Sequence, residues 1–495
     1  MNDSGTAFLD SLIKEQSAPA VATVDNETIS FSGDRLKINM PAGHELVEAD
    51  QIRQILMQNP TEDSVALAYR TAFRDQEIYM HGKGCWFDWT GEFWAEDTCK
   101  RHYDRIRNLA RSANLKGHAA PAKASFVAGV DTHLRYDPAF SRHVSSFDVD
   151  TNLLNTPAGT IDLRVQVTKP HLPGDCITQI TNVAPSSTGG SRFSVFLDEI
   201  TDGDNGLKLF HQCSLGSILS GATEEHWLLF WFGAKSRNGK NTFGDLVVWI
   251  LGSYAGVMPT SALMQKSNDS HPTEMMNLKG KRLVVSSEVP EGCFWNESRL
   301  KETTGDSTLQ GHYMRQDWIE FPRTHKHLIY GNHKPQLRNI DMAIQARFKL
   351  VPFPVSFVGR EDPDLSEKLR AEAPFILHWL LEGHRIWREN GKRLVKCAAV
   401  EKASTEYFAS QSTLEMWIEE RCEVLTSCED IAWSNCAKSG ELYADFSEWK
   451  KKRGEVPPSH TRWGAQMGEK FQCGKSDGVR YRGLRLIHRF LQAVY

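Results

Sequence analysis

A Gly-Lys pair stands between an apolar run and an apolar helix in the segment HWLLFWFGAKSRNGKNTFGDLVVWIL. The run from Trp227 to Phe232 predicts a buried strand, and the residues after Lys240 predict a helix. Gly239 would let backbone N–H groups turn toward a phosphate, Lys240 would place a positive charge on it, and the helix N-terminus would add its dipole. Together these residues have the chemistry of a loop that binds the polyphosphate of a nucleotide.

The same loop departs from the usual pattern of GxxxxGK followed by Ser or Thr. Ala234 stands at the first glycine position with Gly233 before it, and Asn241 separates Lys240 from Thr242. The alternative interpretation of this segment is a strand–turn–helix junction that contains Gly-Lys by chance. Further motifs must therefore decide between the two.

Two more apolar strands each end in a polar residue. In LKGKRLVVSSEVPEG the strand at Arg282 to Ser286 is followed by Glu288, and in HKHLIYGNHKP the strand ends at Asn332. A carboxylate in that position can hold magnesium through water and polarise an attacking water, and an amide can hydrogen-bond the γ-phosphate or that water. The three strands predict one parallel sheet with a site at its carboxyl edge.

The length and composition of the chain indicate which class of protein carries these motifs. The 495 residues are enough for three modules, and a content of 40% hydrophobic and 24% charged residues is typical of a globular protein. The longest apolar run is far shorter than a membrane span and the start MNDSGTAF has no signal-peptide pattern, so we expect a cytoplasmic protein without membrane contact. The ten cysteines form no CxxC pair, which leaves zinc-ribbon and redox motifs without support. A net charge of −4 predicts that any contact with nucleic acid is local.

The chain also shows a change of character along its length. Residues 1 to about 45 predict a few short strands or a loose arm, and Glu48 to Tyr79 predicts two helices separated by Pro60. The aromatic block GKGCWFDWTGEFWAED predicts a packed hairpin with its turn at Thr90-Gly91, and RHYDRIRNLARSAN predicts a basic helix. After the linker NVAPSSTGGSRF, strands and helices alternate until about residue 365, and beyond it the pattern is helical.

In their order, these motifs resemble the superfamily 3 helicases of phage, satellite and plasmid replication proteins, akin to the poxvirus primase-helicase group. RNGKNTF resembles the phosphate loop of that family, GKRLVVSSE its Walker B motif, KETTGD its B-prime motif and YGNHKP its motif C, followed by an Arg before LVPF. FDVDTNLLNTPAGTIDL resembles the domain before the ATPase, and ELYADFSEWKKKRG with RYRGLRLI resembles a C-terminal winged helix. The resemblance covers roughly residues 79 to 495.

The resemblance implies a role for each matching residue. The catalytic group would be Lys240 for phosphate, Glu288 for the attacking water, Asn332 as sensor and Arg347 as arginine finger toward a neighbouring subunit's ATP. Because Ala346 stands where relatives carry a second Arg, Arg338 is the alternative finger. ATP would be lined by Gly233, Asn238, Gly239, Lys240, Asn241, Thr242 and Arg338, and magnesium would be held by Thr242 or Asn241 together with Glu288.

DNA contacts are implied for two further segments. The hairpin KETTGDSTLQGHYMRQDWIEF would track the phosphates of one strand, with Lys301, His312, Tyr313 and Arg315 as contacts, although an ordinary hairpin with exposed charges is the alternative. The C-terminal cluster Lys450 to Arg453 and a wing with Lys475, Arg480, Arg482 and Arg485 would bind duplex DNA, and solvated charged faces are the alternative there.

The expected fold is multidomain α/β. A P-loop, AAA+-like superfamily 3 ATPase core at residues 201–365 would follow a small α+β N-terminal region, with an arm and helices of unknown role at 1–78 and a pre-helicase domain at 79–200. A helical and winged-helix-like domain would occupy 366–495.

The expected function is an ATP- and magnesium-dependent DNA helicase in replication initiation of a phage, satellite or plasmid. It would translocate 3′ to 5′ on single-stranded and forked DNA as a ring, expected to be a hexamer, in the cytoplasm of the host cell. No primase activity is expected, so a separate primase or replication protein would supply primers. The alternative is an ATP-switched oligomeric DNA-binding or interference protein without processive unwinding; a small-molecule P-loop kinase fits the hairpin and the winged helix poorly.

Overall fold

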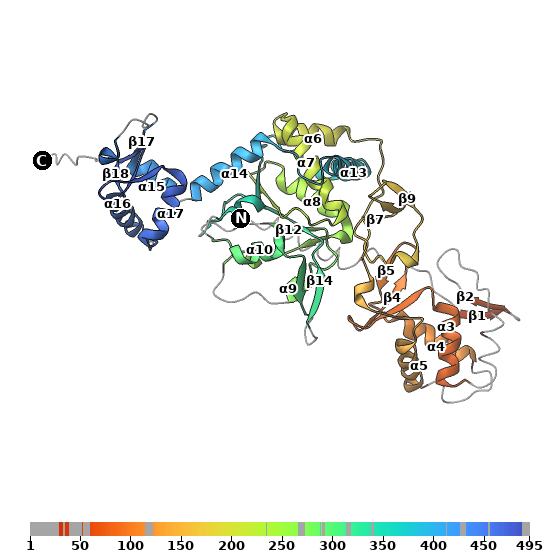
Figure 1. Cartoon of the computed structure of the whole chain (residues 1–495). Coiled ribbons are helices and arrows are strands. Elements are labelled where there is room, and N and C mark those ends of the chain that lie inside the picture. The colour runs from red at the N-terminus through yellow and green to blue at the C-terminus, as the bar shows by residue number, and fades with distance from the viewer. Residues whose placement is uncertain are drawn as a thin grey trace. The chain divides into compact units, whose positions relative to one another are not determined.

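The computed structural model describes residues 29–32, 35–38, 52, 60–113, 121, 123–233, 235–265, 273–287, 289, 293–312, 318–337, 341–411, 413–425, 432–453 and 456–487 (Figure 1). The chain forms two compact units, one from Met1–Pro335 with Ala346–Val400 and one from Gln336–Gln345 with Glu401–Tyr495. Helices and sheets occur in both units, so the chain has a multidomain α/β structure. Within the described residues, no helix is both long enough and apolar enough to span a membrane.

The N-terminal part of the first unit is a small α+β module. Its four-stranded sheet has the order β5-β4-β3-β6, and a separate two-stranded hairpin pairs β1 with β2. The elements are β1 (Ile29–Ser32), β2 (Arg35–Ile38), α3 (Glu62–Phe73), β3 (Glu77–Met80), β4 (Cys85–Trp89), β5 (Trp94–Glu96), α4 (Arg101–Ala113), α5 (Ala124–Tyr136) and β6 (Ser141–Arg142).

The aromatic block forms the predicted hairpin. β4 pairs antiparallel with β5, and the hydroxyl of Thr90 accepts from the backbone N–H of Phe93 at 3.0 Å in the turn. Trp86, Phe87 and Trp94 are buried, which confirms that these aromatic side chains serve packing. The predicted basic helix is α4.

The structure corrects the expectation of a helix as far as Tyr79. α3 ends at Phe73, and Glu77–Met80 is a fully buried strand whose Glu77 accepts a hydrogen bond from the hydroxyl of Tyr69 at 2.6 Å. A strand buried on both faces gives a continuous apolar run that helical spacing can imitate. The expected boundary between residues 78 and 79 falls inside this strand, and side chains from α3, α4 and α5 share one core on both sides of it.

A three-stranded antiparallel sheet leads from this module to the centre of the unit. Its strands are β7 (Leu153–Thr156), β8 (Gly159–Asp162) and β9 (Val167–Lys169). The backbone N–H of Asn155 donates to the hydroxyl of Tyr254 at 3.0 Å, and Leu154 and Ile161 are buried in the central core. The expected boundary near residue 200 therefore separates no independent core.

The centre of the unit is a five-stranded parallel sheet in the order β11-β12-β15-β10-β16. The strands that carry the motifs are β10, β12 and β15, which confirms the prediction that they share one parallel sheet. Its strands are β10 (Leu228–Phe232), β11 (Ala255–Val257), β12 (Leu283–Ser287), β15 (Lys326–Gly331) and β16 (Phe348–Pro352).

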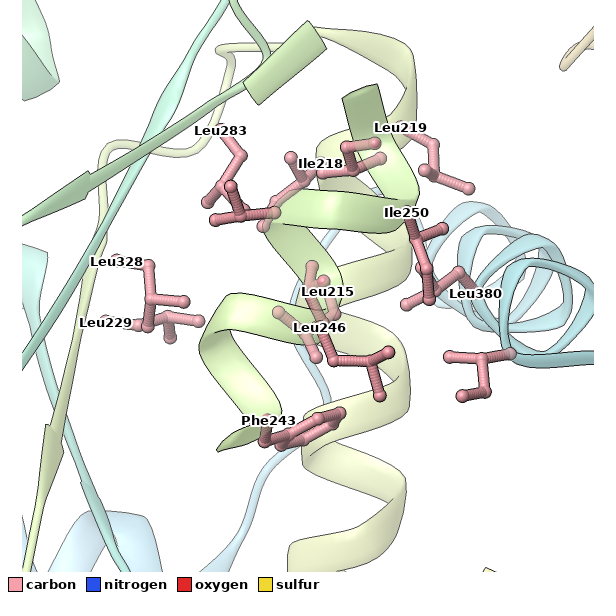
Figure 2. Packing of buried hydrophobic residues seen from close by; sticks show 14 of the residues in the cluster. Leu215, Ile218, Leu219, Leu229, Phe243, Leu246, Ile250, Leu283, Leu328 and Leu380 are labelled. Carbon is pink, nitrogen blue, oxygen red and sulfur yellow. The ribbon is translucent and has the colours of Figure 1, made fainter. Parts of the chain in front are cut away.

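Helices cover the sheet and bury its apolar side chains. Figure 2 shows Phe243, Leu246 and Ile250 of α8 among leucines of the strands and of the neighbouring helices. The helices of this region are α6 (Ser191–Thr201), α7 (Asn205–Ser217), α8 (Lys240–Leu251), α9 (Thr273–Met276), α10 (Glu297–Gly305), α12 (Leu365–Ala371) and α13 (Ala373–Glu389). Two further helices, α11 (Met342–Arg347) and α14 (Ala398–Gln411), each contain residues of both units.

Two glycines let α7 and α13 approach each other closely. A methyl group at Gly216 would lie 2.3 Å from the backbone nitrogen of His384, and one at Gly383 would lie 2.0 Å from the carbonyl oxygen of Gln212. Leu377 and Leu380 of α13 belong to the core of the sheet. The boundary expected at residue 365 is therefore misplaced, because α12 and α13 complete the core of the first unit.

The second unit holds a separate core. Its helices are followed by short strands, with sheet orders β18-β20-β19 and β17-β21. The elements are α15 (Thr413–Arg421), β17 (Cys422–Val424), β18 (Ala437–Lys438), α16 (Ser439–Lys452), α17 (His460–Lys470), β19 (Cys473–Lys475), β20 (Val479–Tyr481) and β21 (Leu484–Leu486).

Candidate functional site

The loop between β10 and α8 turns tightly enough to present its backbone to an anion. Gly239 has φ +83° directly before α8, and a methyl group there would lie 2.7 Å from Cγ2 of Ile200. Gly233 begins the loop, where a methyl group would lie 1.7 Å from Nδ2 of Asn238. Close packing thus favours glycine at both positions. At Gly239 the left-handed backbone requires it as well.

Lys240 is the buried cation of this loop. It is the first residue of α8 and only 5% exposed, and burial lowers the pKa of its ammonium. Its Nζ donates to Oδ1 of Asn332 at 2.5 Å and to Oδ1 of Asn238 at 3.4 Å. The structure therefore brings together three of the predicted residues, from the loop and from the end of β15.

The parallel register explains this meeting. Phe232 is paired with Gly331, so the loop after β10 and Asn332 after β15 leave the sheet at the same edge. Neighbouring strands lie about 5 Å apart, within reach of a lysine side chain. A helix N-terminus, a lysine and an amide thus converge where a phosphate group would be bound.

The segment from Ser356 to Glu361, which lies in none of the predicted motifs, contacts the loop between β10 and α8. The backbone N–H of Phe357 donates to the carbonyl of Arg237 at 2.8 Å, and the hydroxyl of Ser356 donates to the carbonyl of Ser236 at 3.1 Å. The guanidinium of Arg237, whose φ is +55°, forms an ion pair with Glu361. Sequence offered no signal for these contacts, because their partners are separated by 120 to 124 residues.

The first turn of α8 carries the predicted magnesium ligands. Asn241 is exposed and Thr242 is half-buried, while Glu288 and Ala234 lie outside the described residues. The described residues contain no group of three His, Cys, Asp or Glu placed to hold a metal ion. A hydroxyl beside a helix N-terminus fits a magnesium ion that keeps several waters and also binds phosphate oxygens of its substrate.

Asp245, further along α8, is a half-buried carboxyl that sequence reasoning missed. It accepts a hydrogen bond from the hydroxyl of Tyr330 at 2.7 Å, which ties α8 to β15. Burial raises the pKa of Asp245 to about 6, although the Tyr330 hydrogen bond and the positive charge of Arg370 oppose this shift. This contact keeps Lys240 and Asn332 on elements that are joined to each other.

Arg347 lies at the opposite edge of the sheet. It is the last residue of α11, directly before β16, and Phe348 pairs with Leu228 at the amino ends of β16 and β10. The five residues of β16 span about 17 Å, so Arg347 is about that far from the carboxyl edge of its own sheet. The alternative residue Arg338 lies outside the described residues.

The predicted DNA hairpin is shorter than expected. Lys301 is half-buried in α10 and is not part of the hairpin, which consists of β13 (Thr308–Gly311) and β14 (Ile319–Pro322). The helical spacing of Leu300, Thr303 and Thr304, all buried, sets this helix. At the hairpin, the ring of His312 lies edge-on to that of Trp318 with centroids 4.9 Å apart. Tyr313 and Arg315 lie outside the described residues.

The cations of the C-terminal wing are largely engaged within their own unit. Arg480 is buried and donates to the carbonyls of Ser476 and Cys436, both at 2.7 Å. Arg482 lies 4.2 Å over the ring of Trp433. Arg485 forms an ion pair with Glu423 at 2.6 Å.

Other cations of this unit remain at the surface. Lys475 is exposed in β19, and the cluster from Lys450 to Arg453 is half-buried to exposed at the end of α16. The predicted wing segment contains the β19–β20 pair, and three of its four cationic residues have partners within this unit.

Comparisons with known proteins add two segments of likeness. Residues 66–202 match a family described as D5 N terminal like, and residues 231–347 match a family of unknown function. The first segment overlaps the part of the chain in which a pre-helicase domain was predicted. A comparison with the curated proteins finds no match.

Among solved structures, the chain is similar to the C-terminal region of NrS-1. The A form apo structure of that region shares 12% identity over 86% of this chain and 99% of that chain, with a TM-score of 0.48. The apo structure of its residues 305–718 shares 16% identity over 62% of this chain and 78% of that chain, with a TM-score of 0.36.

Proposed function

We propose that this protein is an ATP-dependent DNA helicase of the superfamily 3 type that acts in replication of a phage, satellite or plasmid. The observation that carries the proposal is the contact of Lys240 with Asn332 at the carboxyl edge of a parallel sheet. The D5 N-terminal-like match at residues 66–202 supports it, because the family resemblance places a pre-helicase domain in that part of the chain.

In this proposal the β10–α8 loop binds the triphosphate of ATP. The N–H groups at the start of α8 and the ammonium of Lys240 neutralise the phosphates, so Lys240 exchanges Asn332 for a phosphate oxygen when ATP enters. Asn332 is then available to orient the attacking water, and Glu288 to polarise it. Magnesium, held through Thr242 or Asn241 and Glu288, would neutralise charge on the β- and γ-phosphates.

Arg347 acts in trans in this arrangement. A residue at the amino edge of the sheet lies about 17 Å from the carboxyl edge, which is too far for its side chain to contact a phosphate bound there in the same subunit. In a ring, one subunit can present its Arg347 edge to the Lys240 edge of the next, which is how an arginine finger completes a neighbouring site. We propose a hexamer for this ring.

The β13–β14 hairpin is the element proposed to track single-stranded DNA in the channel of the ring. His312 after β13 and Trp318 before β14 offer ring faces for bases, and Lys301, on α10 before the hairpin, is the cation proposed for the backbone. The proposed translocation is 3′ to 5′.

Unwinding of a forked duplex tests the proposal. The wild type is compared with Lys240→Ala, Glu288→Gln and Lys301→Ala, and we expect strand separation only when ATP and magnesium are present. The two site variants should neither hydrolyse ATP nor unwind, whereas Lys301→Ala should hydrolyse ATP with little unwinding. A wild type that binds DNA without hydrolysing ATP or unwinding would replace the proposal with the ATP-switched DNA-binding or interference protein.

A further inference from the structure

The C-terminal end of α10 lies directly against the guanidinium of Arg347. A methyl group at Gly305, the last residue of α10, would lie 2.7 Å from Nη2 of Arg347 and 3.6 Å from its Cζ. A methyl group here would force the guanidinium to leave this position. The contact is also favourable electrostatically, because the C-terminus of a helix carries a partial negative charge.

The residues after Gly305 are fixed to the base of the hairpin. Arg323, which follows β14, donates through its backbone N–H to the carbonyl of Ser307 at 2.9 Å and through Nε to the carbonyl of Asp306 at 2.7 Å. Its Nη2 donates to the carbonyl of Thr223, in the segment before β10, at 3.2 Å. Arg323 is 3% exposed, so both ends of the hairpin are held by one buried side chain.

A continuous chain of contacts therefore runs from the hairpin to Arg347. β13 and β14 are joined at their base through Arg323 to Asp306, Asp306 continues covalently into Gly305, and Gly305 packs on Arg347. Arg347 in turn leads directly into β16, the edge strand of the sheet.

We infer that Gly305 is the positioning residue of Arg347, and that it is the joint through which the β13–β14 hairpin sets the place of this arginine in the neighbouring subunit's ATP site. The inference rests on the proposed function. A hairpin displaced by DNA moves the end of α10, and the guanidinium that lies on it moves too. DNA bound by one subunit thereby changes ATP hydrolysis at the site that its Arg347 completes.

The variant Gly305→Ala tests this joint in the full-length chain. Its methyl group must push the guanidinium aside, so DNA-stimulated ATP turnover should fall roughly ten- to hundred-fold. The KM for ATP should stay near that of the wild type, because the loop with Lys240 is at the other edge of the sheet. Gly468→Ala is the matched control, since Gly468 is also a helical glycine but its methyl group would meet nothing within 4 Å.

A mixing experiment separates positioning from simple damage. Subunits of Gly305→Ala keep Lys240 and subunits of Lys240→Ala keep a well-placed Arg347, so mixed rings contain sites with both groups intact. DNA-stimulated turnover of the mixture should exceed the sum of the two variants alone, as it should for Arg347→Ala mixed with Lys240→Ala. Arg347→Lys, which leaves α10 unchanged, should show the same loss and the same rescue even where the Gly305→Ala chain fails to fold.

The outcomes distinguish the joint from the function on which it rests. A wild type without ATP turnover overturns the proposed helicase and this inference with it. A wild type with normal turnover, beside a Gly305→Ala protein that DNA stimulates equally well, overturns the joint alone. A loss that Lys240→Ala subunits fail to rescue also overturns it, because the defect would then lie within the variant's own site.

Discussion

The ammonium of Lys240 is buried, and its partners are amide oxygens without a formal charge. A buried cation is costly unless it is hydrogen-bonded, and Asn332 at 2.5 Å and Asn238 at 3.4 Å supply that compensation. Because both partners are neutral, a phosphate oxygen can displace them without breaking an ion pair. The arrangement keeps the lysine in place for an anionic ligand.

Replacing Asn332 with Ala should affect turnover more than binding. The variant removes an amide proposed to orient the attacking water, and loss of one such group lowers kcat by about 100-fold. Lys240 keeps Asn238 as a partner, so the KM for ATP should change little. Steady-state ATP hydrolysis measures both constants; a raised KM with an unchanged kcat would mean that Asn332 only holds Lys240.

Replacing Asp245 with Asn should stabilise the protein at alkaline pH. Burial raises the folded-state pKa of Asp245 from 3.8 to about 6, so its stabilising contribution is present below pH 4 and is lost as the pH rises through 6. The Asn side chain still accepts from Tyr330 and carries no charge, which gives a gain of up to about 3 kcal/mol at pH 8.

Thermal unfolding of this variant at two pH values checks the sign. Asp245→Asn should melt above the wild type at pH 8 and together with it at pH 4. Asp104→Asn, at a carboxyl that is 63% exposed, is the control and should show no such pH dependence. Equal melting of Asp245→Asn and wild type at pH 8 would contradict the cost assigned to this buried carboxylate.

At the residue scale, the sequence predicted the loop residues and Asn332 because each follows an apolar strand in a recognisable motif. Their contact follows from parallel pairing, which puts all strand ends at one edge. Asp245, Glu361 and Gly305 escaped prediction, since each depends on a partner distant in the chain. The sequence places Lys301 on the hairpin because it treats the whole segment from Lys301 to Phe321 as one strand pair. In the structure, the buried residues around Lys301 recur at helical spacing, so Lys301 lies on α10.

At the scale of elements, the packing of α7 against α13 sets how the sheet is covered. Gly216 and Gly383 bring the two backbones together, and the leucines of both helices fill the space beside α8 (Figure 2). Periodicity predicted α8 and the strands that carry the motifs, but the change of pattern also placed a domain boundary at residue 365. The pattern of apolar residues in a helix is the same whether the helix packs on the preceding sheet or on a following domain.

Replacing Gly216 with Ala should destabilise the first unit by about 1–3 kcal/mol, the usual cost of overpacking a core. The new methyl group would lie 2.3 Å from the backbone of α13, which cannot move without displacing its leucines. The drop in melting temperature measures the effect. Gly206→Ala, at an exposed position of the same helix, should leave the melting temperature unchanged or slightly raised, and an equal drop in both variants would refute the close approach.

For the whole molecule, the two edges of the parallel sheet belong to two different proposed ATP sites. In the proposal, Lys240 and Asn332 bind the subunit's own nucleotide, whereas Arg347 acts on the neighbour's nucleotide and the hairpin on the DNA. The residue pattern predicted the strands and the phosphate-binding loop, and the family resemblance suggested the roles of the individual residues. The three wing arginines predicted as DNA contacts have partners within the second unit: Arg480 donates to the carbonyl of Cys436, Arg482 lies over the ring of Trp433 and Arg485 pairs with Glu423.

The most direct test of the account is the rate of ATP hydrolysis by the full-length chain with and without single-stranded DNA. The account predicts that magnesium-dependent hydrolysis by the wild type rises when DNA is added, and that Lys240→Ala shows no hydrolysis in either condition. Hydrolysis that persists in Lys240→Ala would place the ATP site elsewhere, and a wild-type rate that DNA leaves unchanged would contradict the coupling of this site to DNA.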